Sequence, residues 1–397
     1  MPIATDTATP PAAPRPEADA LIDVPPGLTG VVAADTRIGD VRGREGFYHY
    51  GPYSAVELAE HRRLDEVWHL VERGELPTAG ERARFRAEIA AERARPLPAA
   101  LRAALPAIAA ASPTAPLDGL RTAVSLLAAA EGMAPSLDVD RTTLRDQGRR
   151  VAAVLPVIVA ALHRLAAGEV PIPPDPSLDP ASDYLRMITG TTPTAEHARA
   201  VERYLVTTID HGFNASTFTA RVVASTGADV GAAVVAAIGA LSGPLHGGAP
   251  ARALDALDAI GHPDRLEAWA RPRIAAGERM MGFGHAVYRT RDPRAALLAR
   301  TAHELGGELV QRAAAVETGM VALLAELKPG RELHANVEYW AGVVMALAGI
   351  PRTLFTPTFA TSRAIGWVAH VVEQVGAGKI IRPSARYVGP PAPRPLP

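Results

Sequence analysis

The feature that most constrains this chain is an amphipathic period of helical length that recurs along almost all of it. In residues 57–72, Leu58, Val67 and Leu70 form a stripe among charged side chains. Apolar residues three or four positions apart form one face of an α-helix, and that face must pack against another element. The pattern therefore predicts a protein built from packed helices, an all-α fold.

Further segments with the same period follow one another toward the C-terminus. Thr78 and Glu81 form a predicted capping box at the start of one of them. The expected helices cover residues 79–94, 117–130, 143–167, 194–209, 228–241, 292–306, 308–327, 337–348 and 356–375. Segments with the alternating pattern of β-strands are scarce, and residues 30–41 are the best candidate for a short hairpin or an extended piece.

Length, charge and cysteine content limit the classes of function. The 397 residues are 48 % hydrophobic, so the chain can bury a large core, and we expect two domains. A formal net charge of −1 provides no general field for nucleic acid or an anionic membrane, so any anion site must be built locally. The chain has no cysteine, which excludes disulfides, thiol nucleophiles and thiolate metal sites.

We expect no targeting segment and no membrane-spanning segment. Residues 1–26 are rich in proline and alanine, carry acidic residues, and are predicted to form a mobile tail. The longest apolar runs, 151–162 and 230–241, are shorter than the roughly 20 residues that span a bilayer. The sequence thus predicts a soluble, cytoplasmic protein.

Four short polar segments interrupt the helical pattern, and each places a titratable residue at a turn or a helix end. They are residues 209–214, 242–248, 282–294 and 336–340, which contain His211, His246, His285 and Glu338. In the third segment, Arg289, Arg291 and Arg294 follow His285. A histidine transfers protons near neutral pH, and a guanidinium group binds carboxylate or phosphate at two points. This combination predicts proton chemistry on an acidic small molecule.

Each of these residues, taken alone, also has a structural interpretation. A single histidine is more often a hydrogen-bonded residue at a helix terminus, and Glu338 or Arg363 alone would be an ordinary surface charge. The stretch GFGHAV lacks the third glycine of a dinucleotide-binding motif and follows no clear strand, so we reject that interpretation. Three histidines and a carboxylate could form a zinc site, but no short ligand spacing such as HExxH supports one.

Taken together, in this order and spacing, the segments resemble the citrate synthase family. The resemblance extends over nearly all of residues 27–390. The motifs that carry it are TTIDHGFNASTFTARVVASTGAD (207–229), SGPLHGGAPARAL (242–254), MGFGHAVYRTRDPRA (281–295), NVEYWAG (336–342), FATSRAIGWVAHVVEQ (359–374) and KIIRPSARYVGP (379–390).

The resemblance implies an enzyme that condenses acetyl-CoA with oxaloacetate and then hydrolyses the citryl thioester, without a metal or a redox cofactor. By motif position, Glu338 is the base that removes a proton from the thioester methyl group. His246 is the donor that stabilises the resulting enol, and His285 polarises and protonates the oxaloacetate carbonyl. A base that acts together with a donor to the thioester oxygen makes such an enol accessible.

The resemblance also implies cationic ligands for the oxaloacetate dianion. His211, Arg294 and Arg363 match the ligands that the family uses within one subunit. Arg382 matches an arginine that the family supplies across a dimer interface. The resemblance therefore implies an obligate homodimer with composite active sites.

For CoA, the resemblance implies that Arg289 contacts a phosphate group, and Arg331 is a weaker candidate for the same role. The family fold is all-α, with a large dimerisation domain and a smaller inserted domain. Mapped onto this chain, the small domain comprises residues 250–348, and the large domain comprises residues 27–249 and 349–397.

One departure from the family pattern concerns the base. Most members carry aspartate where this chain has Glu338, and the extra methylene moves the carboxylate by roughly 1 Å, a displacement that can cost about 10²-fold in rate. Two alternatives to citrate synthesis stay open. One is 2-methylcitrate synthesis from propionyl-CoA in the same site, because one extra methylene changes binding in an apolar pocket by only about 1–3 kcal/mol. The other, which only the glutamate supports, is a non-catalytic paralogue that binds oxaloacetate or CoA.

Overall fold

The computed structural model describes residues 22–247, 249–285 and 287–396, which fall into two compact units. One unit is Thr36–Ile381, and the other, here called the terminal unit, combines the described parts of 1–35 and 382–397. The terminal unit contains a 3₁₀ helix, Pro26–Leu28. The predicted tail, residues 1–26, lies outside the described residues as far as residue 21.

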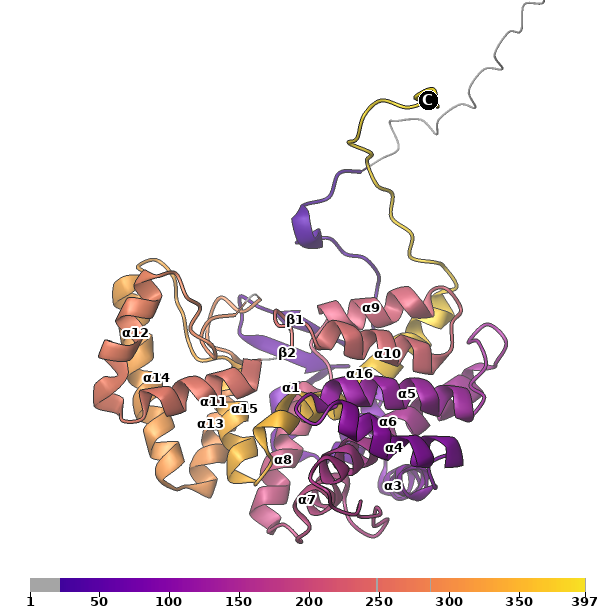
Figure 1. The fold of residues 1–397 in the computed structure, drawn as a ribbon, viewed down its shortest axis with the longest axis horizontal. Helices are drawn as coiled ribbons and strands as arrows, with labels where there is room; N and C mark the ends of the chain where they lie inside the picture. Colours follow the sequence, from indigo (N-terminus) through magenta and orange to yellow (C-terminus); the bar gives the residue numbers. More distant parts are fainter. Residues whose placement is uncertain (1–21, 248, 286, 397) are drawn as a thin grey trace, which may run out of the picture. The chain divides into compact units, whose positions relative to one another are not determined.

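Sixteen α-helices in the described residues confirm the all-α prediction (Figure 1). They are α1 (Ala55–His61), α2 (Leu64–Arg73), α3 (Ala79–Ala94), α4 (Ala99–Ala111), α5 (Pro116–Ala130), α6 (Arg141–Ala166), α7 (Pro180–Thr189), α8 (Ala195–Thr208), α9 (Ala215–Ala224), α10 (Val230–Leu241), α11 (Ala249–Ile260), α12 (Leu266–Ala275), α13 (Pro293–Leu305), α14 (Glu308–Leu327), α15 (Val337–Leu347) and α16 (Phe355–Ala377). No helix among the described residues is long and apolar enough to cross a membrane.

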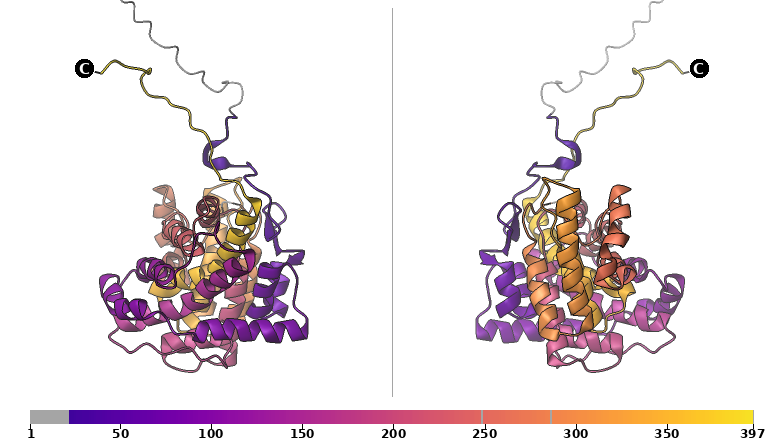
Figure 2. Two further views of the ribbon diagram at one scale, coloured as in Figure 1. Left: turned by 90° about the vertical axis from the view of Figure 1, so that its right-hand side faces the viewer. Right: turned by 90° about the vertical axis from the view of Figure 1, so that its left-hand side faces the viewer.

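Helices α6 and α16 form the centre of the core in Thr36–Ile381. Both are buried along most of their length, and α16 also contacts α2, α8, α9 and α10. Helix α16, yellow, runs among the other helices in Figure 1 and Figure 2. Gly148 brings the two helices close together, because a Cβ atom at this position would lie 2.3 Å from Cγ1 of Val368. Such a contact is far shorter than van der Waals packing allows, so this mid-helix glycine is explained by packing.

The described strands form one small antiparallel sheet in the order β1 (Gly39–Arg42), β2 (Phe47–Tyr50) and β3 (Tyr53–Ser54). Residues 30–41 were expected to form a short hairpin or an extended piece, and only 39–41 lie in a strand, so a hairpin within this segment is wrong. The true partner strand, β2, has four residues, which is too short for an alternating pattern to be recognised reliably. Tyr48 and Tyr50 point inward from β2, and the Tyr50 hydroxyl donates to the carbonyl of Val206 at 3.0 Å.

Helices α11 to α15 form a group beside the rest of this unit (Figure 1). Helix α15 contacts α11, α13 and α14, and α12 packs on α14. The group meets the other helices mainly through α8 and α16. The two compact units of the chain do not follow the predicted domain boundaries, so the division at 250–348 stays a prediction.

Local backbone chemistry explains where the predicted helices differ from the observed ones. The helix expected over 57–72 is two helices, because Arg62 and Arg63 adopt extended conformations between them. The Glu66 carboxylate accepts the backbone N–H of Arg63 at 2.9 Å and so caps α2. The sequence did not predict α4 and α12, and each carries an internal proline, a residue that argues against a helix interior.

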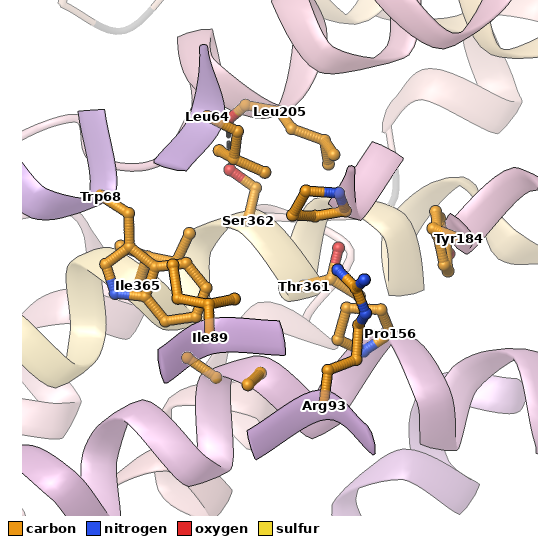
Figure 3. A pocket seen from close by; sticks show the side chains of 13 residues that line it. Leu64, Trp68, Ile89, Arg93, Pro156, Tyr184, Leu205, Thr361, Ser362 and Ile365 are labelled. Carbon is orange, nitrogen blue, oxygen red and sulfur yellow. Dashed lines mark hydrogen bonds between the residues drawn. The ribbon is translucent and has the colours of Figure 1, made fainter. Parts of the chain in front are cut away.

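A small apolar cavity lies beneath α16, and it is a packing defect of the core. Figure 3 shows its lining, with Trp68, Ile89 and Ile365 on one side and Arg93 at the other. Its volume of about 30 Å³ is that of roughly one water molecule, far too small for a substrate.

The buried ion pair beside this cavity supports a prediction about stability. Arg93 Nε lies 3.0 Å from Oδ2 of Asp183, and the two residues are 3 % and 0 % exposed. Replacing Asp183 by alanine leaves a buried guanidinium without its counter-charge, so we expect the free energy of unfolding to fall by about 3–5 kcal/mol. Urea titration measures this change. A loss below about 1 kcal/mol, the range of an exposed pair, would contradict the prediction.

Candidate active site

The loop that carries His211 lies directly against α16. Gly366 makes this possible, because a Cβ atom there would lie 2.1 Å from the carbonyl oxygen of Ile209. The neighbouring carboxylate, Asp210, is buried and lies 3.1 Å from Nε2 of His370 on α16. The close approach of the loop to Gly366 and the hydrogen bond between Asp210 and His370 together hold the His211 loop against α16.

His285 is held by two backbone N–H groups of its own loop. Nδ1 accepts hydrogen bonds from the N–H groups of Val287 at 2.9 Å and Tyr288 at 3.0 Å. Since a backbone N–H can only donate, Nδ1 carries a lone pair, and the proton of the neutral ring is on Nε2. Burial, together with the charge of Arg294, lowers the pKa of His285 to about 4. His285 is therefore a neutral hydrogen-bond donor through Nε2.

Arg294 is paired with an acid that lies two residues before it. Its Nε and Nη2 atoms donate to Oδ1 and Oδ2 of Asp292 at 3.0 and 2.9 Å. Asp292 also accepts the backbone N–H groups of Arg294 and Val337, so it ties the start of α13 to the start of α15. Arg294 Nη2 lies 3.1 Å from Nε2 of His285. With the proton of His285 on Nε2, both nitrogens are donors, and a contact between two donors is unfavourable by itself. A ligand oxygen that accepts from both groups would relieve it.

His211 packs beside His285 and Tyr288. Its Nε2 lies 3.0 Å from the hydroxyl of Tyr288, and its ring is edge-on to that of His285, with ring centres 5.6 Å apart. Burial, and then the charge of Arg294, hold the pKa of His211 well below its usual range. His211 is therefore a neutral hydrogen-bonding group, not a cation.

His246 follows α10 and is oriented by the start of α9. Its Nε2 accepts the backbone N–H of Ser216 at 3.3 Å and lies 2.8 Å from the Ser216 hydroxyl. This places the proton of the neutral ring on Nδ1. Burial, and then the charge of Arg363, lower the pKa of His246 to about 4. The two histidines thus present opposite nitrogens as donors, Nδ1 of His246 and Nε2 of His285.

Glu338 lies in the first turn of α15, next to the N-cap residue Asn336. Its backbone N–H donates to the Asn336 side chain at 3.0 Å, which fixes the start of the helix. Among the described residues, nothing forms a hydrogen bond or an ion pair with the Glu338 carboxylate. Desolvation inside the protein raises the pKa of Glu338 to about 7, although the charges of Arg294 and Arg363 oppose this effect. A carboxylate with this pKa can accept a proton and release it near neutral pH.

Arg363 is a fully buried guanidinium in the middle of α16. Its Nε donates to the carbonyl of Thr208 at 2.8 Å, and the guanidinium lies 4.6 Å from the centre of the Phe359 ring. Within the described part of the chain, no carboxylate forms an ion pair with it, and burial lowers its pKa. The buried carboxylate of Asp210 attracts it only from beyond ion-pair distance. A buried cation without a direct ion pair is costly, so the arrangement favours an anionic ligand.

The two candidate CoA-phosphate ligands, Arg331 and Arg289, lie in a region that is more open to solvent than the three half-buried histidines and the buried Arg363. Arg331 lines a cavity of about 510 Å³ together with Arg279, Lys328 and His285. Arg289 is exposed, and its backbone N–H donates to the carbonyl of Gly43 at 3.0 Å. The cavity therefore connects a cluster of cations to one of the proton donors, which suits a phosphate-bearing ligand with a reactive end.

Arg382 belongs to the terminal unit, where it is exposed, and its predicted role across a dimer interface stays a prediction. The sequence analysis missed Asp292, Tyr288 and Ser216, which orient Arg294, His211 and His246. The Asp-Pro-Arg order at 292–294 is a recognisable helix start and could have identified Asp292.

The described side chains do not form a metal-binding site. Among the described residues, no group of three or more histidine, aspartate or glutamate side chains is placed to hold a metal ion. The prediction that the reaction needs no cofactor is a separate statement and stays a prediction.

Comparison with known proteins identifies the family. Residues 27–384 match the family model of the citrate synthase C-terminal domain. The chain is 37 % identical to the citrate synthase of Haloferax volcanii over 91 % of this chain and 95 % of that one. It is 36 % identical to the 2-methylcitrate synthase of Mycobacterium tuberculosis over 94 % of this chain and 93 % of that one.

A solved structure shows the same relationship. The chain superposes on citrate synthase from Thermoplasma acidophilum, which was solved as a ternary complex with carboxymethyl coenzyme A and oxaloacetate. The TM-score is 0.83 and the identity 29 %, over 93 % of this chain and 97 % of that one. From its motifs, its fold and these similarities, the chain belongs to the citrate synthase family.

Proposed function

We propose that Glu338, His246 and His285 carry out the reaction of the family in this chain. The chain is an enzyme that condenses acetyl-CoA with oxaloacetate and water to give citrate and CoA. The observation that supports these roles is the Glu338 carboxylate, which has no partner among the described residues and a pKa of about 7, in a site with two neutral histidine donors.

The first step is proton removal from the thioester methyl group. Glu338 takes the proton, and the C–H electron pair moves into an enolate, whose oxygen accepts a hydrogen bond from Nδ1 of His246. The enolate carbon then attacks the oxaloacetate carbonyl, and the carbonyl oxygen takes the Nε2 proton of His285 to become a hydroxyl. The proton that Glu338 holds balances the proton that His285 gives up. Water finally cleaves the thioester of citryl-CoA, which releases citrate and the CoA thiol.

The binding roles follow from the charges. Arg363 has no carboxylate partner among the described residues and suits one carboxylate of oxaloacetate, while Arg294 keeps Nη1 available although Asp292 neutralises its charge. His211 adds a neutral hydrogen bond. We assign Arg382 of a second subunit to the remaining carboxylate, which makes the functional unit a homodimer.

For the CoA moiety, we assign Arg331 and Arg289 to its phosphate groups. The cavity of about 510 Å³ beside Arg331 supports this role because it reaches His285. The reaction as written uses only protein side chains and substrates, so we propose that it needs no metal and no redox cofactor.

One assay tests the function. Thiol release is measured with oxaloacetate and either acetyl-CoA or propionyl-CoA, and we expect the larger kcat/KM with acetyl-CoA. A preference for propionyl-CoA would favour 2-methylcitrate synthesis, the named activity of the relative at 36 % identity. No thiol release with either substrate, despite measurable oxaloacetate binding, would favour the non-catalytic alternative.

The pKa of Glu338 predicts a pH dependence. Because the base must be ionised, kcat/KM for acetyl-CoA should fall as the pH is lowered through about 7, the pKa of Glu338 in the free enzyme. His246 and His285, with pKa values of about 4, stay neutral over this range. A Glu317→Gln variant, which removes another acid with a raised pKa, should keep the profile. A profile that is flat through pH 7 would contradict the assignment.

A further inference from the structure

A second cluster of arginines lies around a cavity of about 210 Å³. Its walls are the end of α2, the start of α6, the C-terminal half of α16 and the residues that lead into β1. Val71, Val368 and Val372 contribute an apolar floor. Four guanidinium-bearing side chains complete the charged part of the lining: Arg37, Arg73, Arg141 and Arg145. The residues assigned above to the reaction are not among the described residues that line this cavity.

The two carboxylates of the cavity wall are already paired. Glu72 Oε1 lies 2.5 Å from Nη2 of Arg149. Glu373 Oε2 lies 2.6 Å from Nη1 of Arg221, and its Oε1 accepts the backbone N–H of Arg37 at 2.8 Å. Arg149 and Arg221 are not part of the described lining. Glu72 Oε1 also lies 3.2 Å from Nε of Arg73, which does line the cavity, so Arg73 is the lining arginine that already has a counter-charge.

Three of the lining arginines lack a counter-charge within the described chain. The side chains of Arg37, Arg141 and Arg145 form no hydrogen bond or ion pair with any described residue. Nε of Arg145 is buried without a hydrogen-bond partner among the described atoms, which is costly for a charged donor. Arg141 is the first residue of α6, whose N-terminus is already capped by the Asp140 carboxylate, so the argument for an anion rests on the arginine side chains and not on the helix dipole. The described lining as a whole is short of negative charge.

We propose that this cavity is a second anion site, which binds a compact oxyanion with two or more negative charges. A phosphate ester and a polycarboxylate both have this chemistry, and guanidinium groups bind either at two points. The apolar floor can cover a non-polar part of the ligand. The proposal does not depend on the reaction proposed above, since the cavity and its charges are separate from the catalytic groups.

A chain of hydrogen-bonding side chains leads from this cavity to the candidate active site. Arg221, which pairs with Glu373 of the cavity wall, donates from Nη1 to Nδ1 of His370 at 3.1 Å. His370 Nε2 in turn donates to Oδ1 of Asp210 at 3.1 Å, next to His211. We therefore expect an anion in the cavity to change the affinity for oxaloacetate, and oxaloacetate to change the affinity for the anion by the same factor.

The test is calorimetric titration of the 397-residue chain with pyrophosphate and, separately, with tricarballylate, without acetyl-CoA or oxaloacetate. We expect saturable binding that an Arg141→Gln, Arg145→Gln double variant weakens at least about ten-fold, as expected from the loss of two charged donors. Binding of pyrophosphate alone would identify phosphate esters as the ligand class. Binding of both would identify any compact polyanion.

Three matched variants locate the binding. Arg86→Gln removes an exposed arginine of α3 outside the cavity and should leave the affinity unchanged. Arg331→Gln removes pyrophosphate binding at the proposed CoA site, and Arg363→Leu removes tricarballylate binding at the oxaloacetate site. If neither anion binds, or if the double variant binds as tightly as the unaltered chain, the second site is disproved. If the affinity for oxaloacetate is the same with and without the bound anion, the linkage is disproved.

Discussion

A Glu338→Gln variant is expected to lose activity by about 10²–10⁴-fold in kcat, the range that a positioned general base contributes. Glutamine has nearly the shape of glutamate but accepts no proton, so substrate binding should change much less than kcat. Thiol release at saturating oxaloacetate measures the effect. If the variant keeps near-normal turnover, Glu338 is not the base.

The same variant is expected to be more stable than the unaltered protein at alkaline pH. The pKa of Glu338 is raised from 4.5 to about 7, so the folded state prefers the protonated form, and ionisation costs stability as the pH rises through about 7. At about 1.4 kcal/mol per pKa unit, the gain is at most about 3.5 kcal/mol above that pH, and it vanishes below 4.5. A variant that is less stable than the unaltered protein above pH 7 would contradict a desolvated carboxylate without a partner.

Glu338→Asp addresses the departure from the usual residue of the family. If the site is built around the longer side chain, the shorter one should lower kcat, because the carboxylate retreats by roughly 1 Å. A higher kcat would mean that the glutamate carboxylate is less well positioned as a base than an aspartate carboxylate would be. In either case kcat/KM should still fall at low pH, because aspartate must also be ionised to act as the base. This fall distinguishes a displaced base from the loss of the base in Glu338→Gln.

Local patterns predicted the long helices well because burial determines their period. The expected segment 308–327 coincides with α14, whose apolar positions face the helices around it. The junction at Arg62 and Arg63 was not predicted, since the helical stripe continues across it. The missed α7, Pro180–Thr189, is short, so its apolar residues do not define a period clearly.

The sequence identified the residues of the candidate site but not which of its charged side chains are paired with each other. His285 and Arg294 come from one motif, and the structure places Nε2 of the first 3.1 Å from Nη2 of the second. The sequence could not show that Asp292 neutralises Arg294 while Arg363 stays without a carboxylate partner in the described chain. That difference depends on which side chains the helices bring together, and it changes which arginine is expected to matter most for an anion.

Arg363→Leu is expected to weaken oxaloacetate binding by about 30-fold or more, since truncating one partner of a buried charge pair costs about 2–5 kcal/mol. The affinity for acetyl-CoA should change little. The free energy of unfolding should change little, because removing a desolvated cation offsets the loss of its hydrogen bond to Thr208 and of its longer-range attraction to Asp210. Binding is measured by calorimetric titration with oxaloacetate, and stability by urea titration.

Arg150→Leu provides the matched control, because Arg150 and Arg363 are both 1 % exposed. Arg150 is paired with Glu131 at 2.8 Å and donates to the carbonyl of Glu92 at 2.6 Å. Its loss should lower the free energy of unfolding by about 3–5 kcal/mol and leave oxaloacetate affinity unchanged, the reverse of the Arg363 result. If both variants lose stability and neither loses affinity, Arg363 is a structural residue, and the oxaloacetate site must be built from other cations.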